Sequence, residues 1–268
     1  KMAINKNNIP SKIITKPAIE NALRVLLAIS GSTNAIIHLT AIAGRLGIEV
    51  SLKDLNKMSD ETPVLVNLKP TGEGYMEDFH ASGSLDHVLL ELKDYLHLDC
   101  INIEGNTIND RLKNISIDYV DRSIIYSKSS PVNSKGGLIT LYGSLAPDGA
   151  ILKRAAASKE LLEHEGRAIV FSSLEDLSLR IDEPNLDVEE NDILVLQNAG
   201  PSSNAGMPEA GYLPIPKKLS EKGVKDMVRI SDARMSGSAF GTIVLHVTPE
   251  SNNGGPLSIV RSGDRIRL

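Results

Sequence analysis

Cysteine occurs once among the 268 residues, as Cys100. A single thiol excludes an intrachain disulfide, and it excludes a zinc or iron–sulfur site built only from this chain's cysteines. Tryptophan is absent and aromatic residues make up 3% of the chain, which argues against a surface on which nucleic-acid bases stack. No apolar run approaches the ~20 residues of a membrane span. Residues 1–16 also lack the apolar stretch of a signal peptide. We therefore expect a cytoplasmic protein without a membrane partner.

Excess positive charge is also missing, because the formal net charge is −5. Without a basic field the chain has no electrostatic reason to bind nucleic acid, and we expect no such partner. Hydrophobic residues make up 41% and charged residues 24%, which are values of a globular protein with a sizeable core. The composition thus predicts a globular protein without the basic field that nucleic acid or an anionic membrane would require.

The hydrophobic pattern changes near residue 120. Before it, apolar residues recur at helical spacing over residues 18–29, 34–46, 52–58 and 85–95, and residues 100–104 predict a short strand. After it come short β-rich runs, at 137–142, 150–154, 167–171, 192–197, 226–230, 242–247 and 256–260. Two helices are predicted among them, at 174–180 and 217–221. The pattern predicts an α/β plus β fold, with an α/β piece in residues 1–120 and a β-barrel-like domain in residues 121–268.

Two segments in the first part carry polar groups at predicted helix starts. Small and hydroxyl residues at 30–34 precede an apolar helix, whose free N–H groups suit a carboxylate or phosphate. The simpler alternative is that Ser32, Thr33 or Asn34 only caps the helix. Glu77 and His80 stand three residues apart and could share a metal, whereas an acidic first helical turn is the simpler explanation.

Two segments in the second part follow predicted strands. Residues 198–209 contain two glycines and two prolines, which fix the backbone path and place Glu209, an oxygen ligand suited to a hard metal ion, at a strand's end. An exposed loop glutamate is the alternative. Residues 231–238 gather Asp232, Arg234, Ser236 and Ser238, and they do not form a nucleophile elbow, because Arg234 interrupts the pattern and no helix clearly follows. A polar turn is the alternative there.

Together these segments resemble the dihydroxy-acid dehydratase / phosphogluconate dehydratase family. The resemblance is carried by five ordered motifs: Ser-Gly-Ser-Thr-Asn-Ala at 30–35, Tyr-Met-Glu-Asp-Phe at 75–79, Leu-Ala-Pro-Asp-Gly-Ala at 145–150, Gly-Met-Pro-Glu at 206–209 and Asp-Ala-Arg-Met-Ser-Gly at 232–237. The stretches 195–201, 213–218 and 228–237 are similar to the arabinonate and xylonate dehydratase branch.

The resemblance implies the C-terminal part of an α/β domain followed by a barrel, with an iron–sulfur cluster and a Mg²⁺ ion in the complete enzyme. It implies a dehydratase, or hydro-lyase, that converts a sugar acid to a 2-keto-3-deoxy sugar acid. By motif, Ser236 is the general base and Glu209 is a magnesium ligand. Ser32, Thr33, Asn34 and Ser238 are expected near the substrate. We also expect a homo-oligomer.

Departures from the family pattern leave alternatives open. Family members are about twice as long, and their cluster cysteines match no position here, so Cys100 is interpreted as a buried strand residue. Ser30 stands where the family usually has glycine. The chain is a fragment that needs a missing N-terminal segment, one subunit of a split enzyme, or a degenerate non-catalytic homologue without the cluster. A portion of a branched-chain dihydroxy-acid dehydratase is a further alternative. In each case we expect the chain alone to bind no cluster and to be inactive.

Overall fold

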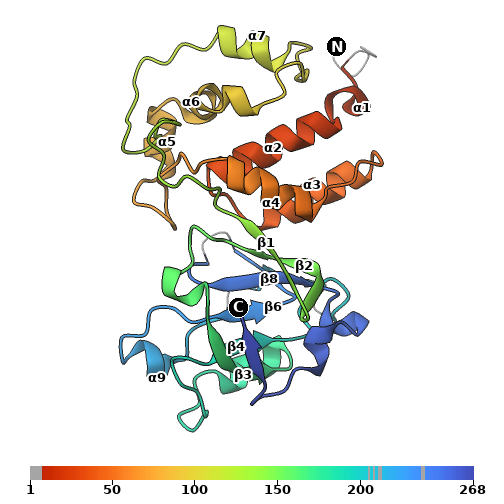
Figure 1. Ribbon diagram of the computed structural model, residues 1–268, viewed down its shortest axis with the longest axis vertical. Helices are drawn as coiled ribbons and strands as arrows, with labels where there is room; N and C mark the ends of the chain where they lie inside the picture. The colour runs from red at the N-terminus through yellow and green to blue at the C-terminus, as the bar shows by residue number, and fades with distance from the viewer. Residues whose placement is uncertain (1–7, 205, 208, 211–212, 237–238) are drawn as a thin grey trace. The chain divides into compact units, whose positions relative to one another are not determined.

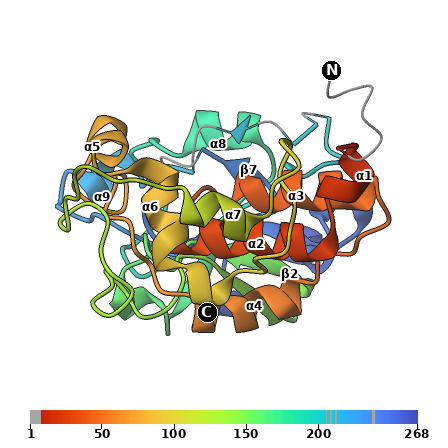
Figure 2. The ribbon, with the colours of Figure 1, turned by 90° about the horizontal axis from the view of Figure 1, so that it is seen from above.

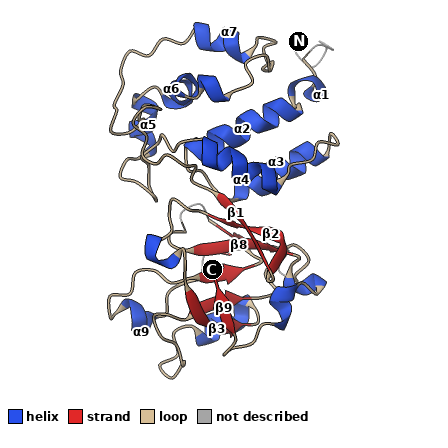
Figure 3. Ribbon diagram, in the orientation of Figure 1, coloured by secondary structure: helices blue, strands red, loops and turns tan. Residues whose placement is uncertain are grey.

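The structure is a computed structural model that describes residues 8–204, 206–207, 209–210, 213–236 and 239–268, with only the backbone described at 209 and 210. The chain divides into two compact units, Lys1–Gly137 and Leu138–Leu268. Helices dominate the first unit and strands the second, as the colours of Figure 3 show. The division falls in residues 114–138, a stretch without helix or strand that also contains the expected limit near residue 120. The domain limits 1–120 and 121–268 stay a prediction.

The first unit is a set of short helices, of which α2 packs against α3, α4 and α6 (Figures 1 and 2). The elements are α1 (Pro10–Ile13), α2 (Lys16–Ala28), α3 (Asn34–Gly44), α4 (Leu52–Glu61), α5 (Met76–Ala81), α6 (Ser84–Glu91), the 3-10 helix η2 (Lys93–Tyr95) and α7 (Ile108–Lys113). The four helices predicted in this part are confirmed, with ends displaced by a few residues.

Capping and apolar spacing account for these helices. The hydroxyl of Thr15 accepts the N–H of Ala18 at 3.3 Å, where α2 begins. Leu23 and Leu27, one turn apart in α2, are both buried, as expected for the face of an amphipathic helix. The hydroxyl of Ser51 caps α4 in the same way, accepting the N–H of Asp54 at 3.2 Å, and a cap of this kind typically stabilises a helix by about 1 kcal/mol.

The strand predicted at residues 100–104 is wrong. Only an isolated bridge between Ile101 and Thr107 forms there. The side-chain oxygen of Asn102 accepts the N–H groups of Glu104 and Asn106, at 2.9 and 3.1 Å. This side chain satisfies the backbone locally, so the segment turns instead of extending. Cys100 is accordingly a half-buried turn residue rather than a buried strand residue.

The second unit is built on a seven-stranded mixed sheet in the order β1-β2-β8-β6-β4-β3-β9. The central strands β8, β6, β4 and β3 are parallel neighbours, and the β1–β2, β2–β8 and β3–β9 pairs are antiparallel. A separate parallel pair joins β5 and β7. The strands are β1 (Ile139–Gly143), β2 (Ala146–Leu152), β3 (Glu165–Phe171), β4 (Ile193–Leu196), β5 (Glu209–Ala210), β6 (Arg229–Ser231), β7 (Arg234–Met235), β8 (Ile243–Thr248) and β9 (Arg265–Arg267).

The central strands are buried on both faces. In β4, Leu194 and Leu196 belong to one apolar cluster, whereas Ile193 and Val195 belong to another. Alternate residues of a strand face opposite sides of the sheet, so this strand separates two cores. The helices are α8 (Leu174–Arg180) and α9 (Lys217–Ser220), with short 3-10 helices η3 (Lys159–Leu161), η4 (Ser251–Asn253) and η5 (Pro256–Ile259). Both predicted helices of this part are confirmed.

Six of the predicted strands are confirmed as β1, β2, β3, β4, β6 and β8, but the one predicted at 256–260 is wrong. That segment forms η5, with Pro256 in its first turn. Proline cannot donate to a strand ladder and suits the first turn of a helix. The expected α/β plus sheet character is present. Within the described part of the chain, β1 and β9 are the two ends of the sheet, so the barrel-like closure stays a prediction.

Candidate active-site segments

The two motif segments of the second unit begin at the same edge of the sheet. Strands β4 and β6 are parallel, and their last residues, Leu196 and Ser231, are partners in the register. The segment that leads to Glu209 starts after Leu196, and the segment that carries Ser236 starts after Ser231. Because parallel strands end together, both segments leave the sheet side by side, where ligands commonly bind in α/β proteins.

A second pairing brings the same segments together again. In the β5–β7 pair, Glu209 is the register partner of Arg234, and Ala210 is the partner of Met235. Ser236 follows β7 directly. The backbone positions of Glu209 and Ser236 therefore lie close together, although 27 positions separate them in the sequence. Only the backbone of Glu209 is described, so its role as a magnesium ligand stays a prediction.

Side chains alternate along β7. Met235 is fully buried in the cluster that contains Leu194 and Leu196. Arg234 and Ser236, on either side of it, are only half-buried. They consequently share the opposite face of the strand. Nε of Arg234 donates to the carbonyl of Met207 at 3.1 Å, which fixes a cation beside the segment before Glu209. Ser238 lies outside the described residues.

Two buried carboxylates hold the loop that follows β4. Asp232, 1% exposed, accepts the N–H of Ala199 at 3.0 Å and that of Ser251 at 2.8 Å. Glu250 accepts the N–H of Ser202 at 2.9 and 3.0 Å. A Cβ on Gly200 would lie 2.3 Å from Oε2 of Glu250, so any larger residue there would displace that side chain. The sequence drew attention to Asp232 but gave no signal for Glu250, whose contacts span 48 positions.

His246 lies beside the Ser236 segment in an unusual conformation. It has φ +54° in a stretch of β8 where two residues, His246 and Val247, face the single residue Ala150 of β2, which is a β-bulge. Its N–H donates to the carbonyl of Ala233 at 3.2 Å. Nε2 is buried and has no hydrogen-bond partner among the described residues. Burial, aided by the charge of Arg234, lowers the pKa of His246 to about 4, so the imidazole is neutral at physiological pH.

The predicted substrate residues 32–34 lie in the first unit, at the start of α3. The hydroxyl of Ser32 accepts the N–H of Asn34 at 3.2 Å, which satisfies one free donor at this helix end. Thr33 is buried and its hydroxyl makes no cap hydrogen bond. Ser30, just before, has φ +49°, a left-handed conformation that glycine adopts most easily. The contacts favour the capping explanation for Ser32. That residues 32–34 lie near the substrate stays a prediction.

The acidic segment before α6 is a helix start. The carboxylate of Asp78 accepts the N–H of Tyr75 at 2.7 Å, which places Glu77 and Asp78 in the first turn of α5. Acidic residues there are stabilised by the helix dipole. This supports the simpler of the two explanations for Glu77 and His80.

Family models match almost all of the chain. The dihydroxy-acid/6-phosphogluconate dehydratase N-terminal model matches residues 1–111, and the corresponding C-terminal model matches residues 123–268. The chain belongs to the dihydroxy-acid/6-phosphogluconate dehydratase family. This confirms the resemblance carried by the five motifs, and it assigns the Ser236 and Glu209 segments to the C-terminal region of that family.

Individual relatives agree with the sugar-acid branch. The chain is 48% identical over 261 residues to an L-arabinonate dehydratase of Rhizobium leguminosarum bv. trifolii, covering 97% of the chain and 45% of the relative. It is 45% identical to a 6-deoxy-6-sulfo-D-gluconate dehydratase of Pseudomonas putida, covering 97% and 45%. A dihydroxy-acid dehydratase of Acetivibrio thermocellus is 38% identical, covering 99% and 47%. The chain spans about half the length of the curated relatives it matches. None of the described helices is long and apolar enough to cross a membrane.

The side chains present here do not fit the iron–sulfur cluster that membership implies. Among the described residues, no three His, Cys, Asp or Glu side chains converge as a metal site. Burial raises the pKa of Cys100, and a hydrogen bond with Thr15 only partly offsets this, whereas cluster ligands are thiolates. Any cluster in a full-length dehydratase therefore takes its ligands from elsewhere, and for magnesium this chain offers Glu209 as one predicted ligand.

Proposed function

We propose that this chain supplies the proton-abstracting segment of a hydro-lyase that converts a sugar acid to a 2-keto-3-deoxy sugar acid. The observation that carries the proposal is the β5–β7 pair, which joins the Glu209 and Ser236 segments where β4 and β6 end. The identities of 45–48% with dehydratases named for arabinonate and sulfogluconate favour a sugar acid over a branched-chain acid.

In the proposed reaction, the deprotonated side-chain oxygen of Ser236 takes the proton from C2 of a 2,3-dihydroxy acid and becomes a hydroxyl. The C3 hydroxyl leaves as water once it has gained a proton, and the resulting enol tautomerises to the 2-keto acid. A serine hydroxyl is a weak base unless a nearby positive charge lowers its pKa. Arg234, on the same face of β7 as Ser236, places one cation there. We assign the departure of the C3 hydroxyl to no residue of this chain.

Glu209 is proposed as a magnesium ligand in the same reaction. A carboxylate oxygen suits Mg²⁺, which binds through one or two carboxylates together with water and substrate oxygens. Magnesium when bound would neutralise the substrate carboxylate and so make the C2 proton easier to remove. We propose that the sugar acid itself is contacted by Ser32, Thr33, Asn34 and Ser238.

The experiment is a substrate panel for a full-length dehydratase that carries this sequence, purified without oxygen. Pentonates, hexonates and 2,3-dihydroxyisovalerate are compared by kcat/KM for 2-keto-acid formation. A pentonate or hexonate at least about tenfold better than the branched acid, a difference of about 1.4 kcal/mol in transition-state binding, supports the proposal. The reverse order supports the branched-chain alternative, which the 38% identity with dihydroxy-acid dehydratases keeps open. No turnover of any substrate favours the non-catalytic homologue.

A further inference from the structure

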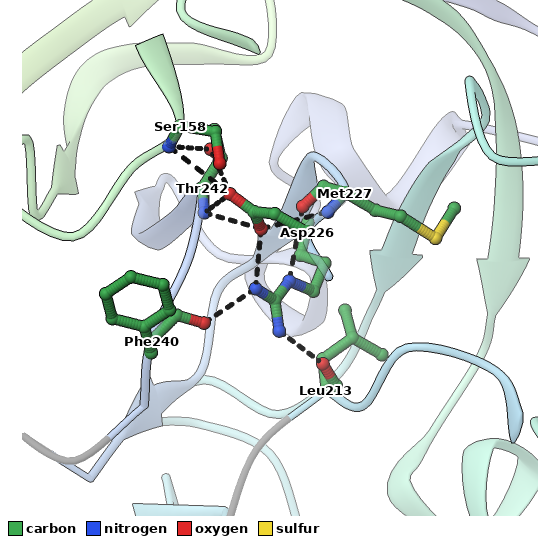
Figure 4. Close-up of polar contacts among 7 residues, drawn as sticks. Ser158, Leu213, Asp226, Met227, Phe240 and Thr242 are labelled. Atoms are coloured by element: carbon green, nitrogen blue, oxygen red, sulfur yellow. Dashed lines mark hydrogen bonds and ion pairs between the residues drawn. The ribbon is translucent and has the colours of Figure 1, made fainter. Parts of the chain in front are cut away.

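A buried guanidinium contacts both segments just beyond the β5–β7 pair. Arg229, in β6, is 4% exposed. Its Nη1 donates to the carbonyl of Leu213 at 3.1 Å, and its Nη2 donates to that of Phe240 at 2.7 Å. Figure 4 shows the carbonyl groups of Leu213 and Phe240, from two different segments, directed at the same guanidinium group. Leu213 follows Glu209 in the chain and Phe240 follows Ser236, so one side chain contacts both segments.

Asp226 holds the guanidinium in place. Its carboxylate pairs with Nη2 of Arg229 at 3.0 Å and accepts the N–H and hydroxyl of Thr242 at 2.9 and 2.8 Å. Ser158 donates its N–H to the same carboxylate at 3.3 Å (Figure 4). Burial alone would raise the pKa of Asp226, but these hydrogen bonds and the charge of Arg229 lower it below its ordinary value. The carboxylate is therefore ionised, and the buried charges neutralise each other in a fixed geometry.

Gly241 gives independent evidence that the chain closes tightly on this pair. A Cβ at this position would lie 2.1 Å from Nη2 of Arg229 and 2.3 Å from Oδ1 of Asp226. The residue also has φ +110°, which L side chains rarely adopt. The backbone between Phe240 and Thr242 is thus shaped around the ion pair.

The β5–β7 pair needs such support, because each strand has only two residues. Isolated two-stranded pairings are marginal in water. Contacts outside the backbone pairing, of which the Arg234–Met207 hydrogen bond is one, therefore help to fix the distance between its strands.

We propose that Arg229 is a positioning residue that sets the spacing between the Glu209 and Ser236 segments by holding Leu213 and Phe240 together. The inference rests on the proposed function for the roles of Glu209 and Ser236. If the Arg229–Asp226 ion pair only stabilised the fold, its loss would instead loosen the whole second unit.

The test is Arg229→Lys in a full-length dehydratase carrying this sequence. Lysine keeps the charge beside Asp226, but its single ammonium cannot reproduce the planar fork that reaches two carbonyls. The control is Arg180→Lys, at a half-exposed arginine of α8 paired with Asp176. Amide hydrogen exchange is measured for peptides covering 209–213 and 236–240, and for the central strands β3 and β4.

We expect Arg229→Lys to accelerate exchange at least about tenfold in both loop peptides, with β3 and β4 within about twofold of wild type. We expect kcat to fall about 10–100-fold, as for supporting residues around other metal sites, with KM less affected. Arg180→Lys should change neither the exchange of the two loop peptides nor kcat. The positioning role is wrong if exchange rises uniformly across the unit, and it is also wrong if exchange rises in neither loop peptide. The same holds if kcat per folded molecule is unchanged.

Thr242→Val is the second variant, should Arg229→Lys fail to fold. It removes, at nearly constant volume, the hydrogen bond that the Thr242 hydroxyl donates to Asp226 and the one that it accepts from the N–H of Ser158, and we expect a smaller acceleration confined to the same two loop peptides. Exchange in any other pattern contradicts the proposal. Because hydrogen exchange requires no turnover, a wild-type protein without dehydratase activity would refute the proposed function while leaving the exchange result readable.

Discussion

The N–H of Ala199 donates to Oδ1 of Asp232 at 3.0 Å, joining the loops that follow β4 and β6. The other oxygen of this carboxylate accepts the N–H of Ser251. One buried side chain thus satisfies two backbone donors from two distant segments. Three loops around the proposed catalytic segment depend on it.

We expect Asp232→Asn to destabilise the protein by roughly 2–3 kcal/mol, because the amide offers one acceptor where two donors are buried, and the other donor is left unsatisfied. Urea denaturation followed by circular dichroism measures the change. Asp148→Asn, at an exposed position of β2, is the matched control and should stay within about 0.5 kcal/mol of wild type. A loss below that level for Asp232→Asn would mean that these hydrogen bonds contribute little.

His246 predicts how stability depends on pH. Its pKa is about 4 in the folded chain, against 6.5 for the ordinary group. Between these values the unfolded chain binds a proton that the folded chain does not, so stability falls as the pH falls. This contribution is complete above about pH 6.5, and it amounts to at most about 3 kcal/mol lost by pH 4.

The check is the difference between wild type and His246→Asn, because asparagine tolerates a positive φ and does not titrate. The free energy of unfolding is measured from pH 7 to pH 4 for both proteins. Their difference should change steadily across that range, whereas contributions from carboxylates such as Asp226 cancel. A constant difference would contradict a neutral buried imidazole.

Ser30 is a strained position in the first unit. Its φ is +49°, and its hydroxyl is buried without a hydrogen-bond partner among the described residues. We expect Ser30→Gly to stabilise the chain by about 0.5–1 kcal/mol, since relief of strain exceeds the added freedom of the unfolded chain. Ser30→Ala, which removes the hydroxyl but keeps the Cβ, should gain less. Equal gains for both would assign the cost to the hydroxyl alone.

The sequence predicted most long elements because their apolar spacing is local information. Helix 174–180 was predicted with the bounds that α8 has, and β4 was recognisable as an unbroken apolar run. It could not predict β5, β7 or β9, which have two or three residues each and depend on partners elsewhere in the chain. For residues 100–104 the apolar content suggested a strand, but the side chain of Asn102 turned the backbone.

The candidate site likewise has features that the sequence predicted and features that only the structure revealed. The motifs drew attention to Glu209 and Ser236, and their closeness followed only from the β5–β7 register. Glu250 carried no sequence signal, and Arg229 stood only within the stretch 228–237 of the resemblance, because the Leu213, Phe240 and Ser202 groups that they bind are backbone carbonyl and N–H groups that any residue supplies. A buried charge is recognisable as an anchor only when the backbone around it is known.

Glu209→Gln tests the predicted magnesium ligand in a full-length dehydratase. The amide keeps the shape of the carboxylate and loses its charge, so we expect magnesium affinity to fall at least about tenfold with the melting temperature nearly unchanged. Magnesium titration of activity measures it. Glu250→Gln is an informative comparison, since that carboxylate accepts the backbone N–H of Ser202 and its loss should lower stability rather than magnesium affinity. Unchanged magnesium affinity in Glu209→Gln would remove Glu209 from the ligand set.

Ser236→Ala is the decisive variant for the proposed reaction. Ser236 is half-buried at the end of β7, and loss of one hydroxyl there should change stability by no more than about 0.5 kcal/mol. Loss of a positioned general base should lower kcat by at least about 10²–10⁴-fold. Ser178→Ala, at an exposed serine of α8, is the matched control and should keep full activity.

Exchange of the C2 proton with deuterated solvent separates proton removal from loss of the C3 hydroxyl, provided that the wild type shows measurable exchange. If Ser236 is the base, Ser236→Ala should lose this exchange together with dehydration, because no carbanion or enol can form before the proton leaves. A variant that still exchanges the C2 proton at the wild-type rate, yet expels no water, would place the base on another residue. Ser236 would then contact the substrate only, and the role of Arg234 beside it would change from lowering the pKa of a base to binding an anionic substrate.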